Sequence, residues 1–443
     1  MEERGCFNYL LIGKRMPLLR IKDSLTSKKY TPHGRRAPGD SYQNTMNIFV
    51  INSGSSSIKY QLFDMPGARV ICSGIVDKIG MKESTLTHKT FTEDGERVTR
   101  STPEVSDHAE GLREVARLLT DPSVGVIRDP SEIAAVGHRV VHGGESFSAT
   151  TFITEEVKEK IRKLFPLAPL HNPLNYLGIQ LSEQIFPSAR QIAVFDTAFH
   201  QTLPPEAYRY ALPGSFYREY GIRAYGFHGT SHRFVSRKAA DYLQKKSSRL
   251  ITLHLGNGCS MTAVRDGKSV ETSMGFGPMN GLIMGTRSGD IDQSVIFHLV
   301  NQLGYDIENV HAILNKKSGM LGLTGLSDMR DIRKKIDGGD SEALLAYQMY
   351  AWRVRKYIGA YTAILNGLDA IVFTGGVGEN DRLMRKFCAT GLDYLGIRLD
   401  PEKNEQAGSG IQEIQSPESR VKILVVPTNE ELEIANQCFE LIG

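Results

Sequence analysis

The sequence predicts an α/β fold built from two copies of one domain. Residues 47–63 read as a strand, a Gly/Ser turn and a second strand, and residues 250–264 repeat that pattern. Segments with helical spacing alternate with further short apolar runs elsewhere in the chain, and this alternation is typical of α/β proteins. A strand–turn–strand unit that recurs after about two hundred residues indicates an internal duplication.

The first hairpin begins directly after Met46. Asn47–Ile51 is a short, β-branched apolar run that ends in the turn Asn52–Ser57. Ile58–Phe63 then alternates apolar and polar side chains, as a half-buried strand does. The segment therefore predicts two antiparallel strands joined by a turn rich in small residues.

The second hairpin has the same form. Leu250–Leu255 is the apolar run, Gly256–Ser260 is the turn, and Met261–Val264 is the returning strand. An Arg-Asp-Gly turn at residues 265–267 ends it. The similarity of the two hairpins is the main reason to expect duplicated domains.

Two long helices are expected toward the end of the chain. Residues 341–366 carry apolar side chains at three- and four-residue spacing, with Gly367 as the expected C-cap. These positions are Leu345, Met349, Trp352, Ile358, Tyr361 and Leu365. The last segment, 429–442, opens with Asn429, a good N-cap, followed by acidic residues that suit a helix N-terminus.

Composition excludes several function classes. The chain has 443 residues, 40% hydrophobic and 23% charged, as expected for a globular protein of two or three domains. No apolar run approaches the ~18 residues of a membrane span, and five cysteines without a C-x-x-C pair predict neither a disulfide framework nor a zinc site. We therefore expect a cytoplasmic protein that acts without a membrane.

The first 45 residues differ from the remainder. They hold nine Lys/Arg and four Asp/Glu, so 44 basic and 46 acidic residues are left of the totals of 53 and 50. The net charge of +3 therefore comes from this segment, and the remainder gives no sign of a nucleic-acid binder. We expect residues 1–45 to be a disordered tail, or a mis-assigned start with the native start at Met46.

Four turns rich in glycine or hydroxyl side chains are each expected to follow a strand: Asn52–Ser57, Gly256–Ser260, Leu326–Arg330 and Thr374–Asn380. Backbone amides in such turns bind phosphate oxygens, because glycine permits close approach and unusual backbone angles. None of the four matches the P-loop pattern, and Gly375–Gly378 does not match the dinucleotide pattern. Together they favour a nucleotide site of another kind.

Polar residues next to these turns suit an anionic substrate. Arg139 and Arg287 each stand in a segment flanked by glycines, where a guanidinium can face a carboxylate or phosphate, although pairing with a local Asp is the alternative for each. His228 and His232 are four residues apart, but their segment is not H-E-x-x-H, so hydrogen bonding to phosphoryl oxygens is favoured over zinc. Asp196 follows a buried strand and Glu430 begins a helix, where carboxylates can hold magnesium or its waters, although a favourable charge at the helix N-terminus is the alternative for Glu430.

Taken together, these stretches resemble the acetate kinase family, within the superfamily of sugar kinases, heat-shock chaperone ATPases and actin. The resemblance covers Met46 to about Ile442 and rests on motifs in a fixed order: NSGSSSIKY, GHRVVHGGE, PLHNP, VFDTAFH, YGFHGTSH, HLGNG, GLIMGTRSGDID, FTGGVGEN and PTNEE. Any one could arise by chance, but the ordered set is specific.

The resemblance implies two ribonuclease H-like domains of actin type facing each other across a cleft. The first would comprise residues 46–197 with the C-terminal helix 430–443, and the second, nucleotide-binding domain residues 198–429. It also implies a homodimer that catalyses the reversible transfer ATP + acetate = ADP + acetyl phosphate, a step linked to acetyl-CoA biosynthesis. The cofactor would be Mg²⁺, with Mn²⁺ as a substitute.

The resemblance also implies roles for individual residues. Asp196, His228 and Arg287 match the family's catalytic residues, and Asn52 and Glu430 its metal-site residues. The substrate would be bound by Arg139, Val141, Leu170, Phe227 and Pro278. The nucleotide would be bound by Lys59, His254, Leu255, Gly256, Asn257, Gly258, Asp328, Met329, Arg330, Gly376, Val377, Gly378, Glu379 and Asn380.

Two departures from the family pattern concern the substrate pocket. Leu174 stands where the family usually has alanine, and Gly277–Asn280 replaces the usual TPLE. Propionate or butyrate kinase therefore stays open as an alternative, since one methylene in an apolar pocket is worth only about 1–3 kcal/mol. A non-catalytic nucleotide switch of the chaperone or actin type is disfavoured, because a switch needs no acceptor site of the kind that Arg139 and Arg287 suggest.

Overall fold

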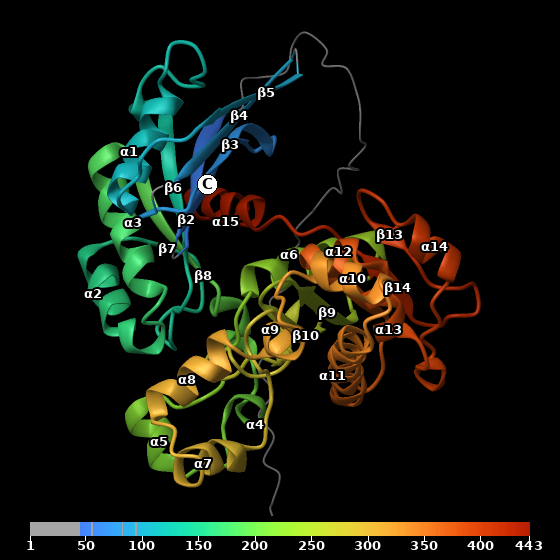
Figure 1. Ribbon diagram of the computed structural model, residues 1–443. Helices are drawn as coiled ribbons and strands as arrows, with labels where there is room; N and C mark the ends of the chain where they lie inside the picture. Colours follow the sequence, from blue (N-terminus) through green and yellow to red (C-terminus); the bar gives the residue numbers. More distant parts are fainter. Residues whose placement is uncertain (1–44, 55, 82, 94) are drawn as a thin grey trace, which may run out of the picture. The chain divides into compact units, whose positions relative to one another are not determined.

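The computed structural model describes residues 45–54, 56–81, 83–93 and 95–443 (Figure 1). Fourteen strands in this part of the chain form two sheets. The first sheet contains β1 (Met46–Ser53), β2 (Ser57–Met65), β3 (Arg69–Asp77), β4 (Thr85–Thr92), β5 (Gly95–Ser101), β6 (Ile133–Val140), β7 (Thr151–Phe152) and β8 (Arg190–Phe195). The second contains β9 (Arg249–Leu255), β10 (Cys259–Arg265), β11 (Lys268–Thr272), β12 (Ala370–Thr374), β13 (Gln412–Glu413) and β14 (Lys422–Val425).

The two sheets repeat one topology. The first has the order β5-β4-β3-β2-β1-β6-β8-β7 and the second β11-β10-β9-β12-β14-β13. In each, three antiparallel strands (β3-β2-β1 or β11-β10-β9) are followed by two parallel ones (β6-β8 or β12-β14) and an antiparallel edge strand. The predicted α/β class and its duplication are therefore confirmed, and β4 and β5 extend the first copy.

Fifteen α-helices are described. They are α1 (His108–Leu119), α2 (Glu155–Lys163), α3 (Asn172–Ile185), α4 (Pro205–Tyr208), α5 (Gly214–Tyr220), α6 (Gly229–Tyr242), α7 (Gln293–Asn301), α8 (Ile307–Lys316), α9 (Gly319–Thr324), α10 (Met329–Asp337), α11 (Ser341–Leu365), α12 (Gly375–Asn380), α13 (Arg382–Ala389), α14 (Pro401–Gln406) and α15 (Glu430–Ile442). None of the helices in the described part of the chain is both long and apolar enough to cross a bilayer.

Helices cover both faces of each sheet, so the central strands are buried on both sides. On the first sheet, Ile48 and Val50 pack with α15, while Phe49 and Ile51 pack with α1 and α3. On the second, α11 lies over β9 and β10 and α6 covers the opposite face. This explains why residues 47–51 are apolar at nearly every position rather than at alternate ones.

Two expectations about local structure are wrong. The turn Leu326–Arg330 follows helix α9, not a strand, because Thr324 ends that helix with Gly325 in a left-handed conformation. Helix α11 ends at Leu365 with Asn366 as the left-handed C-cap, one residue before the expected Gly367. Asparagine tolerates positive φ better than most residues, which makes the two positions hard to separate by sequence.

The apolar spacing along the first half of α11 also misled the prediction. Leu345, Met349 and Trp352 are 47%, 40% and 65% exposed, whereas Tyr347 and Tyr350 are buried. The buried face is thus displaced around the helix, because two tyrosines take the inward positions. Further along, Ile358, Tyr361 and Leu365 are buried as predicted.

The C-terminal helix begins as expected. Asn429 is the N-cap of α15 and its side chain accepts a hydrogen bond from the backbone N–H of Leu432. The helix packs on β1, β2 and β6 of the first sheet and also contacts α6. The predicted tail, residues 1–45, lies outside the described residues except for Thr45.

Candidate active site

Functional side chains predicted from the sequence gather where the parallel strands of the first sheet end. Asn52 is near the end of β1, Arg139 near the end of β6, and Asp196 directly follows β8. Strands β1 and β8 both pair in parallel with β6. The carboxyl ends of the three strands therefore lie at one edge of the sheet, where ligands of α/β sheets usually bind. The hairpin pattern and the parallel crossovers thus bring together residues more than 140 positions apart.

Arg139 is held by three oxygen-bearing side chains. Its Nη2 forms an ion pair with Asp196, its Nη1 donates to Oδ1 of Asn52 at 3.3 Å, and its Nε lies 3.6 Å from Oε2 of Glu430. Burial alone would lower the pKa of Arg139, but the Asp196 and Glu430 carboxylates outweigh it and raise that pKa. The second oxygen of Asp196 accepts a hydrogen bond from Thr230 at 2.9 Å. Asp196 therefore fixes the guanidinium in place.

Glu430 lacks full compensation for its charge. Burial, helped by the nearby Asp196 carboxylate, raises the pKa of Glu430 to about 7, although Arg139 opposes the shift. The side chain stands at the first position of α15, close to Asn52 through their shared partner Arg139. A carboxylate in this condition favours binding a further cation.

The second arginine has a different environment. Nη1 of Arg287 donates to the carbonyl oxygen of Pro278 at 2.7 Å, and burial lowers the pKa of Arg287. Among the described residues, no carboxylate lies within ion-pairing distance of Arg287. Arg287 is half-buried, and withdrawing a guanidinium from water without a counter-ion is costly. It is therefore well suited to an anionic ligand.

Four histidines form a group beside the arginines, in which His200 and His232 are buried and His228 and His254 are half-buried. His228 is the N-cap of α6 with φ of 55°, and its ring stacks on that of His254 with centroids 4.4 Å apart. His232 and His200 complete the group. Burial lowers the pKa of His200 and His254 to about 4, and that of His228 and His232 well below the usual value. His228 is therefore neutral at pH 7 in this structure, so it lacks the fixed positive charge that a phosphoryl site suggests.

The sequence analysis missed His171, which stands at the N-cap of α3. Burial and the charges of Arg139 and Arg287 lower the pKa of His171, so both guanidinium groups act electrostatically on its ring. This places the two arginines around one space. The motif HNP held the signal, since a histidine before Asn-Pro at a helix start is well placed to face a site.

Asn172 and Asn175 of the same helix were also missed. Asn172 exchanges hydrogen bonds with the backbone of His142 at 3.0 and 2.9 Å, while Asn175 accepts from the N–H of Val141 at 3.1 Å and donates to the carbonyl of Ser53 at 3.0 Å. Both side chains are buried. They fix the strand ends from which Arg139 and Asn52 project.

The residues expected to surround the substrate methyl are placed unevenly. Val141 and Phe227 are buried in one apolar cluster, and Pro278 is half-buried next to Arg287 through its carbonyl oxygen. Leu170, in contrast, is 56% exposed. Val141 and Phe227 thus belong to the buried core and Pro278 lies against Arg287, whereas Leu170 lies at the surface.

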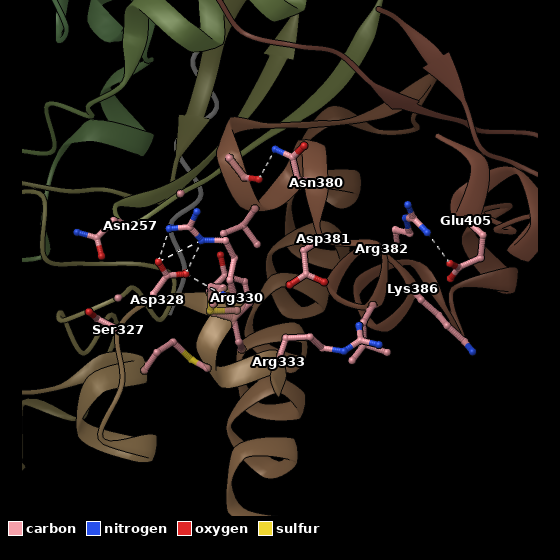
Figure 2. A pocket seen from close by; sticks show the side chains of 18 residues that line it. Asn257, Ser327, Asp328, Arg330, Arg333, Asn380, Asp381, Arg382, Lys386 and Glu405 are labelled. Atoms are coloured by element: carbon pink, nitrogen blue, oxygen red, sulfur yellow. Dashed lines mark hydrogen bonds and ion pairs between the residues drawn. The ribbon is translucent and has the colours of Figure 1, made fainter. Parts of the chain in front are cut away.

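A large pocket lies in the second half of the chain (Figure 2). Its volume is about 1230 Å³. Of the fourteen residues expected to bind a nucleotide, eight line it: Gly256, Asn257, Asp328, Met329, Arg330, Gly376, Val377 and Asn380. Figure 2 shows Arg330 paired with Asp328 at the rim, and that pairing lowers the pKa of Asp328 to about 2.

Close backbone approach shapes one end of this pocket. A Cβ on Gly285 would lie 1.9 Å from Oδ1 of Asn257, so a larger residue there would displace the Asn257 side chain from its place at the pocket. Gly285 also donates its N–H to the carbonyl of Asn257 at 2.9 Å. The segment that carries Arg287 is thereby held against the Gly256–Ser260 turn.

The remaining expected nucleotide residues do not line the pocket. Leu255 is fully buried, His254 belongs to the histidine group, and Lys59 is exposed on β2 opposite Asn52. Gly378 and Glu379 belong to the short helix α12. Oε1 of Glu379 accepts from the N–H of Gly375 at 3.0 Å and of Thr428 at 3.1 Å, so this carboxylate joins two loops. Gly258 lies between His228 and Arg287.

Comparison with known proteins gives one consistent result. A sequence profile described as the Acetokinase family matches residues 47–436. An acetate kinase of Flavobacterium johnsoniae is 59% identical over 397 residues, which is 90% of this chain and all of that protein.

Two solved structures are similar over nearly the same range. The acetate kinase of Porphyromonas gingivalis is 43% identical with a TM-score of 0.84, over 90% of this chain and 100% of that one. A propionate kinase from Francisella tularensis is 41% identical with a TM-score of 0.82, over 88% and 98%. Both the sequence match and the fold lead to the same conclusion: the chain belongs to the acetokinase family.

Proposed function

We propose that this protein is an acetate kinase, which transfers a phosphoryl group reversibly between ATP and acetate to give ADP and acetyl phosphate. Family membership over nine-tenths of the chain supports the reaction class. The observation that carries the proposal is the pair of guanidinium groups: Arg139 is paired with carboxylates, whereas Arg287 is half-buried with only neutral partners. One cation is thus held in position, and the other is available to an anion that arrives.

The acceptor needs no general base. A carboxylic acid with an ordinary pKa of about 4 is already ionised at neutral pH, so its oxygen is nucleophilic as bound. Asp196 therefore serves to orient Arg139, which would hold the acetate carboxylate, with Val141 and Phe227 beside its methyl group. Such positioning is the main requirement for phosphoryl transfer.

Charge stabilisation of the transferred group would come from Arg287 and His228. Arg287 would contact the phosphoryl oxygens as the group becomes planar, where a preorganised cation is most effective. His228, which is neutral here, would donate a hydrogen bond through Nε2. The nucleotide would occupy the pocket lined by Asn257, Asp328 and Gly376, with its phosphates toward Gly258.

The residues present fit a bound Mg²⁺. Oδ1 of Asn52 and the carboxylate of Glu430 are hard oxygen ligands, and the raised pKa of Glu430 reflects burial that the neighbouring Arg139 does not fully offset. No group of three or more Asp, Glu, His or Cys side chains that could form a metal site occurs in the described ranges. Mg²⁺ usually keeps waters and binds through one or two carboxylates plus phosphates. When bound, Mg²⁺ would neutralise phosphate charge.

We also propose the domain division given by the resemblance, with residues 46–197 and 430–443 forming the first domain and residues 198–429 the second. The packing of α15 on β1, β2 and β6 supports it. The homodimer and the cytoplasmic location stay predictions.

The test is trapping of the product. Purified protein would be incubated with ATP, Mg²⁺ and acetate in the presence of hydroxylamine, which converts an acyl phosphate into a coloured hydroxamate. We expect hydroxamate formation that requires all three components. ATP hydrolysis without hydroxamate would contradict the proposal and favour a nucleotide switch.

Propionate kinase activity is the second candidate, favoured by the similarity to the propionate kinase structure. The chemistry is the same and only the acyl pocket differs. Running the hydroxamate assay with acetate, propionate and butyrate separates the two, because a propionate kinase would show a higher kcat/KM with propionate than with acetate.

A further inference from the structure

A chain of buried hydrogen bonds leads from β9 to His228. Thr252 Oγ1 lies 2.7 Å from Nδ1 of His232, Nε2 of His232 lies 2.7 Å from Oγ of Ser260, and that oxygen lies 2.9 Å from Nδ1 of His228. Thr252, Ser260 and His232 are each fully buried, with 0% exposure. We call these three residues, together with His228, the relay.

The relay ends beside the proposed phosphoryl site. A Cβ placed on Gly258 would lie 3.4 Å from Nε2 of His228 and 3.8 Å from Nη1 of Arg287. The backbone of Gly258 therefore has both groups as neighbours, at distances where a Cβ would make ordinary van der Waals contact with each. No hydrogen-bond partner of Nε2 of His228 occurs among the described residues, so this atom is the open end of the relay.

Counting protons couples the two histidines. Burial keeps the pKa of His228 and His232 low, so each ring carries one N–H at neutral pH. The Ser260 hydroxyl has one proton to donate and faces one nitrogen of each ring. If it donates to His228, then His232 must donate to Ser260; if it donates to His232, then His228 must donate to Ser260 through Nδ1. The tautomer of one histidine thus fixes that of the other.

Only one direction suits a phosphoryl ligand. Phosphoryl oxygens accept hydrogen bonds, so Nε2 of His228 must carry the proton and Nδ1 must accept from Ser260. His232 then donates through Nε2 and accepts at Nδ1 from the Thr252 hydroxyl. In the opposite direction the hydroxyl of Thr252 turns to the carbonyl of Thr262, 3.4 Å away, and His228 presents a lone pair that repels the phosphoryl oxygens.

From this geometry we infer that Ser260 and His232 are positioning residues for phosphoryl transfer: the relay holds the His228 ring and keeps the proton on Nε2, so that a neutral histidine donates to the transferred group. The inference rests on the proposed function, since it assigns a task to a side chain of that site. The strained backbone of His228, with φ of 55°, agrees with a ring whose position is set by its surroundings.

The kinetic test removes the Ser260 hydroxyl. Ser260→Ala should lower kcat by about tenfold or more, the usual size for a partner that orients a catalytic histidine, with KM for acetate and for ATP within about twofold of wild type. In a His228→Ala background the same substitution should cause no further loss of kcat, because Ser260 acts through His228. An equal loss of kcat in both backgrounds would overturn the inference.

Spectroscopy tests the tautomer directly. Protein labelled with ¹⁵N-histidine would be studied with Mg²⁺, ADP and aluminium fluoride, a planar mimic of the transferred phosphoryl group, and His228→Gln would assign its signals among the 12 histidines. In the wild type, the spectrum should show the proton of His228 on Nε2. In Ser260→Ala this Nε2–H signal should be lost, or should appear together with an Nδ1–H signal. A wild-type spectrum with the proton on Nδ1 would contradict the relay.

Controls separate this result from a loss of folding and from failure of the proposed function. Ser269→Ala removes a buried Ser–His hydrogen bond of the same length, 2.9 Å to His200, and should lower Tm similarly without the drop in kcat. Ser260→Cys keeps a weak donor and should give an intermediate kcat if Ser260→Ala does not fold. The hydroxamate assay on the wild type tests the proposed function separately. If the wild type phosphorylates acetate and Ser260→Ala has an unchanged kcat, only the relay is refuted.

Discussion

At the scale of single residues, charge and burial decide which side chains are prepared for ligands. Glu430 is the clearest case, because its pKa of about 7 lies well above the ordinary 4.5. Removing its charge from water costs free energy that Arg139 only partly repays. The site therefore takes up either a proton or a cation at neutral pH.

This leads to a pH prediction for metal binding. Mg²⁺ or Mn²⁺ needs the ionised carboxylate, so affinity should fall about tenfold between pH 8 and pH 6 as Glu430 is protonated. Binding of Mn²⁺ in the presence of ADP, followed by electron paramagnetic resonance, measures it. In Glu430→Gln the affinity should be low and this additional pH dependence absent, whereas Glu440→Gln, an exposed carboxylate near the other end of α15, should behave as wild type. A wild-type slope in Glu430→Gln would exclude Glu430 as the group concerned.

The same shift predicts a change in stability. Because the folded pKa of Glu430 is raised, its contribution is fully favourable below the ordinary value of 4.5 and is lost as the pH rises through about 7. In the absence of metal, the Tm of Glu430→Gln should therefore fall less between pH 5 and pH 8 than the Tm of the wild type.

A further prediction at the scale of single residues concerns acyl specificity. Val141→Ala removes two methyl groups from the cluster shared with Phe227, and should raise kcat/KM for propionate relative to acetate by about tenfold at most. Val140→Ala is the matched control, since Val140 is the neighbouring fully buried valine of β6 in a different apolar cluster. Unchanged preference ratios in Val141→Ala would place the acyl pocket elsewhere.

At the scale of elements, Glu379 joins the two loops that border the site. One carboxylate oxygen accepts from Gly375, which begins α12, and from Thr428, two residues before Glu430. Charge-assisted hydrogen bonds of this kind contribute about 1.5–3 kcal/mol. The fully buried Arg385 supports the same helix by donating to the carbonyls of Gly378 and Glu379 at 3.1 and 2.7 Å.

Glu379→Gln should therefore loosen both loops at once. We expect a lower Tm and a higher KM for ATP, with a smaller change in KM for acetate, measured by thermal melting and initial-rate kinetics. Glu155→Gln, which removes an exposed carboxylate paired with Lys158, should change neither. If Glu379→Gln raised KM for ATP without lowering Tm, the carboxylate would act as a direct nucleotide ligand instead.

Sequence predicted the elements best where the period was unambiguous. The hairpins and the N-cap at Asn429 follow from local patterns, and the structure confirms them. The turn at Leu326 and the first half of α11 could not be predicted in the same way, because Tyr347 and Tyr350 take buried positions by bonding to distant groups, Asp381 and Cys259. Such tertiary partners leave no local signal.

At the scale of the whole molecule, the site depends on contacts between the two copies of the repeated topology. Thr230 of α6 donates a hydrogen bond to Asp196, which follows β8. The charges of Arg139 and Arg287 both lower the pKa of His171 of α3. The sequence motifs contain these residues but do not predict their partners, and His171 was not predicted as a site residue. The neutral state of His228 and the link made by Glu379 follow from burial and from hydrogen bonds across long separations. The duplication itself was readable from two hairpins.

The central claim is a division of labour between the two arginines. Arg139 is fixed by Asp196 and Glu430 and would hold the carboxylate in the ground state, whereas Arg287 has only neutral partners and would act most strongly in the transition state. Losses of about 10²–10³-fold are typical when one preorganised donor is removed.

Steady-state kinetics of Arg139→Ala and Arg287→Ala with acetate and ATP test this claim most directly, with the ATP series as the internal control. We expect Arg139→Ala to raise KM for acetate far more than KM for ATP, and Arg287→Ala mainly to lower kcat. The claim would be contradicted if Arg287→Ala raised only the KM for acetate while kcat held, because Arg287 would then be a substrate clamp.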